Sequence, residues 1–144
     1  MQFYHQPMQA PSVRLATIEI PVRSLARASG WYEAALGYTS EWSDGHHAML
    51  VPRGDAAGAP KLLLVETADE DARLAFGSTH TAITHSVLDF ESRDLDALHA
   101  HLTRLGTTID ELGPPKNDWA PRGFGFEDTE GNRLGAFEYQ AAGD

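Results

Sequence analysis

The sequence predicts an α+β domain built from two copies of one unit, in which a strand is followed by a helix and then by further strands. Two observations support this fold class. At two places in the chain, a strand-like alternation of apolar residues leads directly into a helix-like spacing that ends at a glycine. The chain also has 144 residues, of which 42% are hydrophobic and 22% charged, as expected for one folded domain.

The first strand is predicted between Leu15 and Val22, where apolar residues occupy alternate positions. A helix follows immediately, because apolar residues then recur every three or four positions. Ser24 is a favourable N-cap for this helix, and Gly37 is a favourable residue just after its end. The apolar strand positions are Ala16, Ile18, Ile20 and Val22, and the helix positions are Leu25, Ala28, Trp31 or Tyr32, Ala35 and Leu36.

The second copy begins with a strand predicted over Ala82 to Phe90, followed by a helical stripe of leucines that ends at Gly106. Ser92 lies 68 residues after Ser24, and Gly106 lies 69 residues after Gly37. The two copies therefore align with one extra residue in the second. The strand positions are Ser86, Leu88 and Phe90, and the stripe is Leu95, Leu98, Leu102 and Leu105.

Each copy ends in a matching strand, Lys61 to Glu66 in the first and Arg133 to Glu138 in the second. A further strand precedes it, over His46 to Val51 and over Gly123 to Glu127. The predicted organisation is a first module at 13–66, a linker at 67–80 and a second module at 81–139. Residues 1–12 are predicted to form an N-terminal arm and residues 140–144 a tail.

Composition and charge argue against several classes of function. Eleven lysines and arginines against 21 aspartates and glutamates give a net charge of -10, which disfavours binding to nucleic acid or to an anionic membrane surface. The chain has no cysteine, so disulfides, thiolate metal sites and cysteine nucleophiles are excluded. No apolar stretch is long enough for a membrane helix, and the first residues lack a signal-peptide pattern. We therefore expect a cytoplasmic protein.

Two motifs accompany the repeat. The first runs from Val22 to Gly37 and contains a Trp-Tyr pair and a Leu-Gly end, and the second is Phe126-Glu-Asp-Thr-Glu-Gly-Asn132 before the last strand. Together with the repeat, over residues 13–139, they resemble the vicinal oxygen chelate superfamily of glyoxalases, bleomycin-resistance proteins and extradiol dioxygenases. In that family a proline stands where this chain has Thr129. The resemblance implies two βαβββ modules whose curled, mixed sheets form one small-molecule cup with the helices outside, and it implies a homodimer.

By this resemblance, enzymes of the superfamily hold a divalent metal at four positions, one on the first and one on the last strand of each module. The corresponding positions here are assigned as Thr17, Leu63, His85 and Gly135, with Thr17 and His85 equivalent in the two copies. Of the four, His85 alone has a side chain that suits such a metal. We therefore expect no cofactor and disfavour a divalent metal. A rebuilt site of Glu19, His47 and His85 is the metal-binding alternative.

The inward faces of the same strands supply the predicted binding residues. His85 and Glu19 are the candidate catalytic groups, because a histidine near neutral pH and a carboxylate in a cavity can both exchange protons. The alternative for His85 is a satisfied interior histidine, and the alternative for Glu19 is a rim residue or a partner of Lys61 or Arg122. The predicted ligand-binding set is Thr17, Glu19, His47, Met49, Leu63, His85, Trp119, Phe124 and Gly135.

Three functions remain open from the sequence. The first is binding of a small organic molecule in the cup without the family metal, similar to the bleomycin-resistance branch. The second is a metal-dependent lyase, isomerase or dioxygenase with a rebuilt site, and the third is a ligand-sensing or assembly module. Small-molecule binding is the leading hypothesis, because three of the four assigned metal positions lack a ligand side chain. The sequence also contains no serine-nucleophile motif and no phosphate-binding glycine loop.

Overall fold

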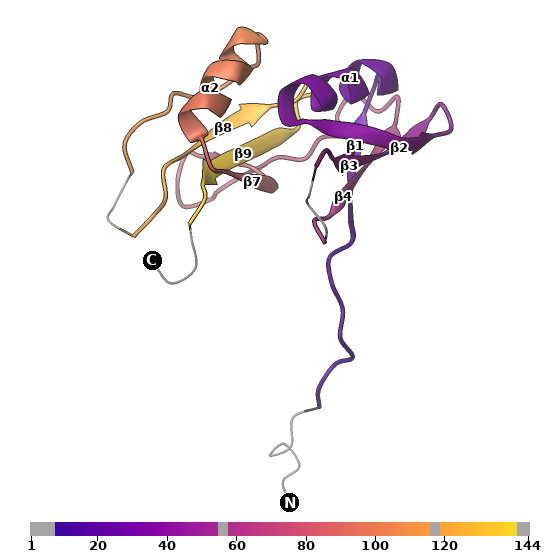
Figure 1. Cartoon of the computed structure of the whole chain (residues 1–144), viewed down its shortest axis with the longest axis horizontal. Helices are drawn as coiled ribbons and strands as arrows, with labels where there is room; N and C mark the ends of the chain where they lie inside the picture. Colours follow the sequence, from indigo (N-terminus) through magenta and orange to yellow (C-terminus); the bar gives the residue numbers. More distant parts are fainter. Residues whose placement is uncertain (1–7, 55–57, 116–118, 141–144) are drawn as a thin grey trace, which may run out of the picture.

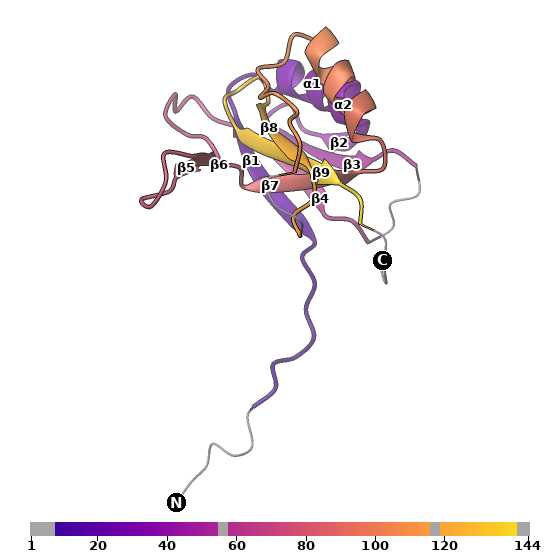
Figure 2. The ribbon, with the colours of Figure 1, turned by 90° about the vertical axis from the view of Figure 1, so that its left-hand side faces the viewer.

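The computed structural model of the chain describes residues 8–54, 58–115 and 119–140. It contains two larger sheets that lie side by side, with both helices on the same side of the molecule (Figures 1 and 2). Each sheet therefore has one face covered by a helix and one face turned away from it, which we call its open face. The α+β class and the paired sheet modules predicted from the sequence are confirmed.

The first module has the complete βαβββ order. Strand β1 (Thr17–Val22) leads into helix α1 (Leu25–Leu36), which is followed by β2 (Tyr38–Ser43), β3 (His47–Pro52) and β4 (Lys61–Glu66). The strand order is β1-β4-β3-β2, with β1 parallel to β4 and the remaining pairs antiparallel. The predicted helix caps are confirmed, because the Ser24 side chain accepts a hydrogen bond from the Arg27 N–H and Gly37 adopts φ 72°.

The second module is shorter by one strand. It consists of β7 (Leu88–Ser92), α2 (Leu95–Arg104), β8 (Gly123–Glu127) and β9 (Arg133–Glu138), in the sheet order β7-β9-β8. At the place of the missing strand, Ile109 forms an isolated bridge with Phe126, and the Asp110 N–H donates to the Gly125 carbonyl at 2.9 Å. Pro114 and Pro115 follow soon after, and proline cannot donate to a strand ladder. In this half, the strand that should follow the helix of the βαβββ unit is therefore reduced to these contacts.

The strand predicted over Ala82 to Phe90 is interrupted. Residues Thr84–His85 form a two-residue strand, β6, which pairs with β5 (Phe76–Gly77) rather than with the main sheet. β5 lies inside the predicted linker. The main strand starts at Leu88, because the chain leaves the ladder between His85 and Leu88. Alternation of apolar residues does not reveal such a break, since both pieces keep the same pattern.

This break changes the alignment of the two copies. Ile18 pairs with Leu62 in the first module, and Leu88 pairs with Leu134 in the second, so Leu88 is the counterpart of Ile18. The N-cap of α2 is Asp94, whose carboxylate accepts from the Ala97 N–H, and not Ser92. The predicted equivalence of His85 and Thr17 is therefore wrong, and Val87 takes that position.

The core lies between the helices and the covered faces of the sheets. Alternate strand residues point toward α1 or α2, and phenylalanines of β8 meet the aromatic pair of α1, with Trp31 and Phe126 ring centroids 6.2 Å apart. This packing joins the two halves into one core. Its residues include Ile20, Val22, Tyr32, Ala48, Leu50, Leu62, Leu64, Leu88, Leu102, Phe124, Phe126, Leu134 and Ala136.

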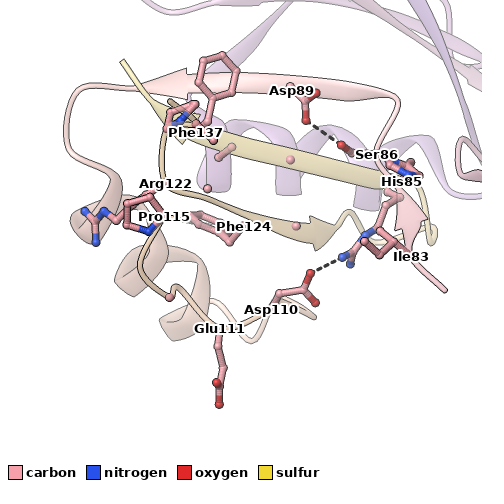
Figure 3. A pocket seen from close by; sticks show the side chains of 18 of the residues that line it. Ile83, His85, Ser86, Asp89, Asp110, Glu111, Pro115, Arg122, Phe124 and Phe137 are labelled. Atoms are coloured by element: carbon pink, nitrogen blue, oxygen red, sulfur yellow. Dashed lines mark hydrogen bonds and ion pairs between the residues drawn. The ribbon is translucent and has the colours of Figure 1, made fainter. Parts of the chain in front are cut away.

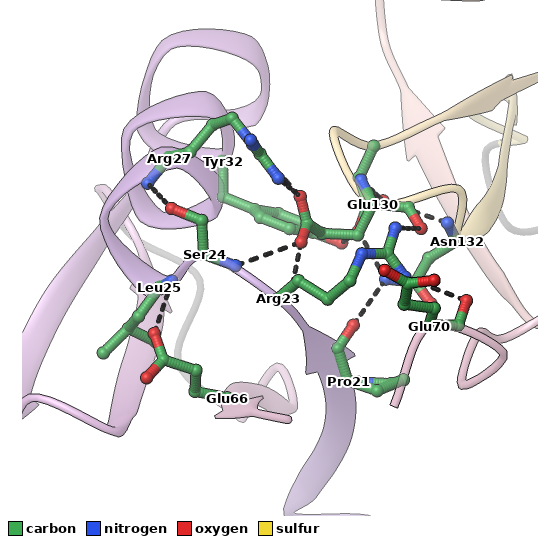
Figure 4. A network of polar contacts seen from close by, with 11 residues as sticks. Pro21, Arg23, Ser24, Leu25, Arg27, Tyr32, Glu66, Glu70, Glu130 and Asn132 are labelled. Atoms are coloured by element: carbon green, nitrogen blue, oxygen red, sulfur yellow. Dashed lines mark hydrogen bonds and ion pairs between the residues drawn. The ribbon is translucent and has the colours of Figure 1, made fainter. Parts of the chain in front are cut away.

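A buried polar turn of the second module, Asp128–Asn132, forms hydrogen bonds to the first module. We call it the inter-module turn. Glu130 is 2% exposed and reaches the start of α1, where it accepts hydrogen bonds from the Ser24 N–H at 3.2 Å and from the Arg27 guanidinium at 2.7 Å (Figure 4). It also accepts from the Arg23 N–H. Burial raises the pKa of Glu130, but these hydrogen bonds outweigh it and hold the pKa below its ordinary value.

The same turn contacts the first module at two further points. The Tyr32 hydroxyl donates to the Asp128 carboxylate at 2.8 Å, and the Asn132 amide donates to the Pro21 carbonyl at 2.9 Å. Burial and the neighbouring Asp128 carboxylate raise the pKa of Tyr32 well above its ordinary value. Buried polar groups are tolerated only when they are paired, and here the pairing spans the two modules.

The predicted N-terminal arm lies partly within the described residues. From Met8 the chain runs as an extended, largely exposed segment away from the sheets until β1 begins (Figure 2). Residues 1–7, and residues 141–144 of the predicted tail, are outside the described part of the chain. Neither helix among the described residues has the length and hydropathy needed to span a membrane.

Candidate functional site

A pocket of about 760 Å³ lies on the open face of the second sheet. It is lined by residues 83–86 beside the sheet, by Asp89, by residues 110, 111, 113–115 and 119–125, and by residues 133 and 135–137 of the last strand (Figure 3). This volume is within the range of pockets that hold small organic ligands. All of its lining residues belong to the second module.

Four residues form one row across the floor of this pocket. Asp89 of β7 pairs with Gly135 of β9, Gly135 pairs with Gly125 of β8, and Asp110 follows at the sheet edge through its hydrogen bond to the Gly125 carbonyl. The floor is hollow because its two central residues have no side chains. We call Asp89, Gly135, Gly125 and Asp110 the floor row.

Polar ends of two neighbouring side chains occupy the space next to the two glycines. A Cβ atom at Gly135 would come within 2.3 Å of the Asp89 carboxylate, and one at Gly125 within 2.3 Å of the Arg133 guanidinium. Asp89 accepts a hydrogen bond from the Ser86 hydroxyl at 2.7 Å, and Arg133 forms an ion pair with Asp110. The glycines therefore let a carboxylate and a guanidinium recess into the floor.

The arginines of the pocket are neutralised by carboxylates. Arg122 lies 2.9 Å from both Asp96 and Glu138, and the hydrogen bonds with Asp96 and then Glu138 raise its pKa above the ordinary value. Arg133 is held by Asp110 in the same way. An anionic ligand would therefore have to displace an existing carboxylate partner at either arginine.

Aromatic and proline residues form the walls. Trp119 is 84% exposed, and Phe137 lies on the open face of β9 next to the floor row. His85 also lines the pocket, and its ring stacks on Phe76 with centroids 5.2 Å apart and an interplanar angle of 14°. Exposed aromatic faces of this kind suit planar ligands.

The predicted binding residues separate into two groups. His85, Trp119 and Gly135 line the pocket. The side chains of Glu19, Leu63 and Met49 form the corresponding row on the open face of the first sheet, since Glu19 pairs with Leu63 and Leu63 with Met49. Two further predicted binding residues, Thr17 on β1 and His47 on β3, lie on the same face, and neither lines the pocket.

Phe124 borders the pocket, but its side chain is not one of the walls. It is 7% exposed and alternates with Gly123 and Gly125, so it points to the covered face. There it packs edge-on against His99 of α2 at 4.9 Å and against Phe126 at 5.7 Å. The side chain of Phe124 therefore belongs to the core, and its predicted role in ligand binding stays a prediction.

The side chains at the four positions that the family uses for a metal do not fit a metal. With the register of the sheets, these positions are Thr17, Leu63, Val87 and Gly135, which offer one hydroxyl and no imidazole or carboxylate. His85 lies in β6, outside this set. Among the described residues, no group of three histidine or acidic side chains could hold a metal ion, so Glu19, His47 and His85 do not assemble into the alternative site.

His47 has a different role in the structure. The carboxylate of Asp44 accepts hydrogen bonds from the backbone N–H groups of His46, at 2.9 Å, and His47, at 2.7 Å, and contacts the His47 ring at 3.0 Å. The two backbone hydrogen bonds lower the pKa of Asp44 to about 2. His47 thus belongs to the tight turn between β2 and β3.

Sequence reasoning missed Asp89, Asp110 and Arg133. One signal for the floor is present in the sequence, namely Gly123 and Gly125 at alternate positions of a strand pattern. Glycine inside a strand indicates that another group approaches the backbone closely. The pairing of Gly125 with Gly135 depends on the register of β8 and β9, which the sequence does not reveal.

Comparisons with known proteins place this geometry in context. A family model described as glyoxalase-like domain matches residues 17–137. No curated protein gives a significant match.

Solved structures similar to this chain share its fold at low identity. TnmS3, an antibiotic binding protein from Streptomyces sp. CB03234, is 23% identical over 92% of this chain and 100% of its own, with a TM-score of 0.62. A member of the glyoxalase/bleomycin resistance protein/dioxygenase superfamily from Sphaerobacter thermophilus is 22% identical over 89% of this chain and 98% of its own (TM-score 0.64). The fosfomycin resistance protein FosX from Listeria monocytogenes, complexed with Mn(II) and sulfate, is 11% identical over 92% and 93% (TM-score 0.66).

Proposed function

The chain belongs to the glyoxalase-like domain family, and from this premise we propose that it binds a small organic molecule, without the family metal, in the pocket on the second sheet. The observation that carries the proposal is the floor row, in which Gly135 and Gly125 project no side chain into a pocket of about 760 Å³. An unfilled concavity with aromatic walls and a few fixed polar groups is the usual form of a ligand site.

A binding role is favoured over a metal-dependent reaction by the donor set. FosX was solved with Mn(II), whereas this chain has Thr17, Leu63, Val87 and Gly135 at the positions assigned to the family metal. TnmS3 is described as an antibiotic binding protein, which is the class of role that we propose here.

A ligand screen tests the proposal. Metabolites and antibiotics are added to the purified protein and the melting temperature is followed; a ligand at 100 times its Kd should add about 2.7 kcal/mol to the free energy of unfolding. The stabilisation should disappear in Gly135→Leu, which gives the floor row the residue found at the equivalent position of the first sheet. Gly30→Ala on α1, where a Cβ meets nothing within 4 Å, is the matched control.

Elemental analysis of protein purified without an affinity tag separates binding from metal-dependent catalysis. We expect substoichiometric zinc, nickel, manganese and iron. One equivalent of any of them per chain, together with turnover of a substrate, would replace the binding proposal with the lyase, isomerase or dioxygenase alternative.

We further propose that the protein is a homodimer in which the open face of each first sheet is covered by the partner. Leu63, Met49 and Val65 are only half-buried on this face in the single chain, and covering them would remove apolar surface from water. The same arrangement would bring Glu19 and Thr17 of one copy toward the ligand of another.

Light scattering at micromolar concentration tests the dimer. We expect a mass of twice 15.7 kDa, and Leu63→Lys should convert it to a monomer because a charge would be buried in the interface. A strict monomer for the unaltered chain would contradict the dimer and leave the pocket proposal intact.

A further inference from the structure

The charge balance of the pocket points to the chemical class of its ligand, and this inference rests on the proposed function. We propose that the pocket selects flat organic cations, which place a ring over the floor row and a cationic amine against Asp89. Three features carry the proposal: a carboxylate without a cation, a floor without side chains and an exposed indole.

Asp89 is the carboxylate available to a ligand. It stands at one end of the floor row and accepts a hydrogen bond from Ser86 at 2.7 Å, and among the described residues it has no ion-pair partner (Figure 3). Glu111, which also lines the pocket, likewise forms no ion pair with a described residue. A carboxylate fixed by one hydrogen bond keeps further acceptor positions for an ammonium or amidinium group.

The cations of the pocket do not compensate these carboxylates. Arg133 is paired with Asp110, and Arg122 is shared between Asp96 and Glu138. Among the described residues of the pocket, the unmatched charge is therefore negative, in the same sense as the net charge of -10 of the whole chain. A cationic ligand is attracted to such a site, and an anionic one is repelled.

The floor determines the shape of the ligand. Gly135 and Gly125 project no side chain into the pocket, and the carboxylate of Asp89 and the guanidinium of Arg133 occupy the space where their Cβ atoms would be. The floor therefore consists of backbone peptide groups and two planar polar groups. A flat ring can contact such a surface over its whole area, whereas a branched molecule touches it at few points.

Trp119 provides the second contact for the same ligand. Its side chain is 84% exposed at the wall of the pocket, which is unusual for an indole that has no ligand or partner to cover it. The face of an indole ring stacks on flat rings and attracts cations through its quadrupole. Trp119 and Asp89 therefore favour the same kind of molecule.

Three flat aromatic compounds of different charge test the preference of the pocket for cations. Proflavine is a cation at neutral pH, acridone has a similar ring system without charge, and anthraquinone sulfonate is an anion. We expect proflavine to bind the unaltered protein about tenfold more tightly than acridone, from one charge-assisted hydrogen bond, and we expect no binding of the sulfonate at the same concentrations. Fluorescence titration and calorimetry give the Kd values.

Variants of the chain then locate the contacts. Asp89→Asn removes the charge and keeps an acceptor for Ser86, so the Kd of proflavine should rise about tenfold while that of acridone is unchanged. Trp119→Ala should raise both Kd values about fivefold. Glu33→Gln is the matched control, because it removes one negative charge from an exposed position on α1 and should change neither.

The outcomes separate this inference from the proposed function. If proflavine binds Asp89→Asn as tightly as the unaltered protein, or if the sulfonate binds as well as proflavine, the preference for cations is wrong. If none of the three compounds binds while the ligand screen finds a neutral or anionic molecule that Gly135→Leu excludes, the inference is again wrong and the pocket proposal stands. If the screen also finds nothing, both are wrong.

Discussion

The open faces of the two sheets have one backbone register and opposite surfaces. On the first sheet, the row Glu19, Leu63 and Met49 is filled by side chains. On the second, the equivalent positions are Asp89, Gly135 and Gly125, and a pocket lies above them. The acidic residue at the end of the row is present in both halves. The two glycines therefore leave the floor of the hollow without side chains, and the segments 83–86, 110–115 and 119–125 supply its walls.

The two halves of the domain differ in what their open faces contribute. The first sheet carries side chains along its row, whereas the glycines of the second sheet weaken the strands and leave the floor of the pocket free of side chains. The second sheet also lacks its full fourth strand, which is reduced to the contacts of Ile109 and Asp110 with β8. The inter-module turn belongs to the second module and connects that module to α1 of the first module.

The largest expected effect comes from breaking the connection between the halves. Glu130→Ala leaves the Arg23 and Ser24 N–H groups without their acceptor, and it should lower the free energy of unfolding by about 3 kcal/mol. Urea unfolding measures it. Glu33→Ala, on the exposed side of α1, should change it by less than about 0.5 kcal/mol. Equal effects of the two substitutions would contradict the role of Glu130.

A second prediction makes the first sheet resemble the second. Leu63→Gly deletes a half-buried side chain and places a glycine within a strand, so the free energy of unfolding should fall by about 2 kcal/mol. Thermal and urea unfolding check this value. The variant should gain no affinity for proflavine, because the side chain of Met49 still fills the neighbouring position of that row. Proflavine binding on the first sheet would show that the missing side chain alone makes the site.

A third prediction compares two glycines with different surroundings. Gly30→Ala should stabilise the protein by about 0.5–1 kcal/mol, because alanine suits a helix and its Cβ meets nothing within 4 Å. Gly135→Ala should give no such gain, since its Cβ would displace the Asp89 carboxylate from 2.3 Å. Melting curves measure both, and a crystal structure of Gly135→Ala should find the Asp89 side chain moved. An equal gain in the free energy of unfolding for Gly135→Ala and Gly30→Ala would contradict the close contact between Gly135 and Asp89.

The smallest expected effect concerns the turn between β2 and β3 of the first module. The Asp44 carboxylate has its pKa lowered from 3.8 to about 2 by hydrogen bonds from the backbone of His46 and His47. Its contribution to stability is therefore present above about pH 4 and is lost as the pH falls toward 2. NMR titration of the carboxyl carbon should give a midpoint near 2, and Asp44→Asn should flatten the acid side of the stability profile. A midpoint near 4 would contradict the turn geometry.

Local signals in the sequence located most elements of the first half. Alternation of apolar residues found β1, and Ser24 and Gly37 mark the ends of α1. The match between the two copies located β4 and β9, whereas β2 was not predicted. The break between His85 and Leu88 was missed, because a chain that leaves a ladder can keep its apolar pattern. This one error moved His85 into a position that belongs to Val87.

The site was less accessible to sequence reasoning than the fold. Trp119, Gly135 and His85 were predicted as binding residues and line the pocket, but their role in binding stays a prediction. Asp89, Asp110 and Arg133 give the site its electrostatics through contacts with residues far along the chain, such as the ion pair of Arg133 with Asp110. Pairings of this kind depend on strand register, which a single sequence constrains only weakly.

A pocket whose depth is set by absent side chains has an evolutionary consequence. Codons for glycine become those for alanine, serine, valine or aspartate by a single base change, so one mutation at Gly125 or Gly135 alters the depth or the charge of the floor. The hydrogen bonds between β8 and β9 use backbone atoms alone and survive each of these changes. Ligand preference in this half of the protein can therefore drift in single steps, while the other half preserves the shared core.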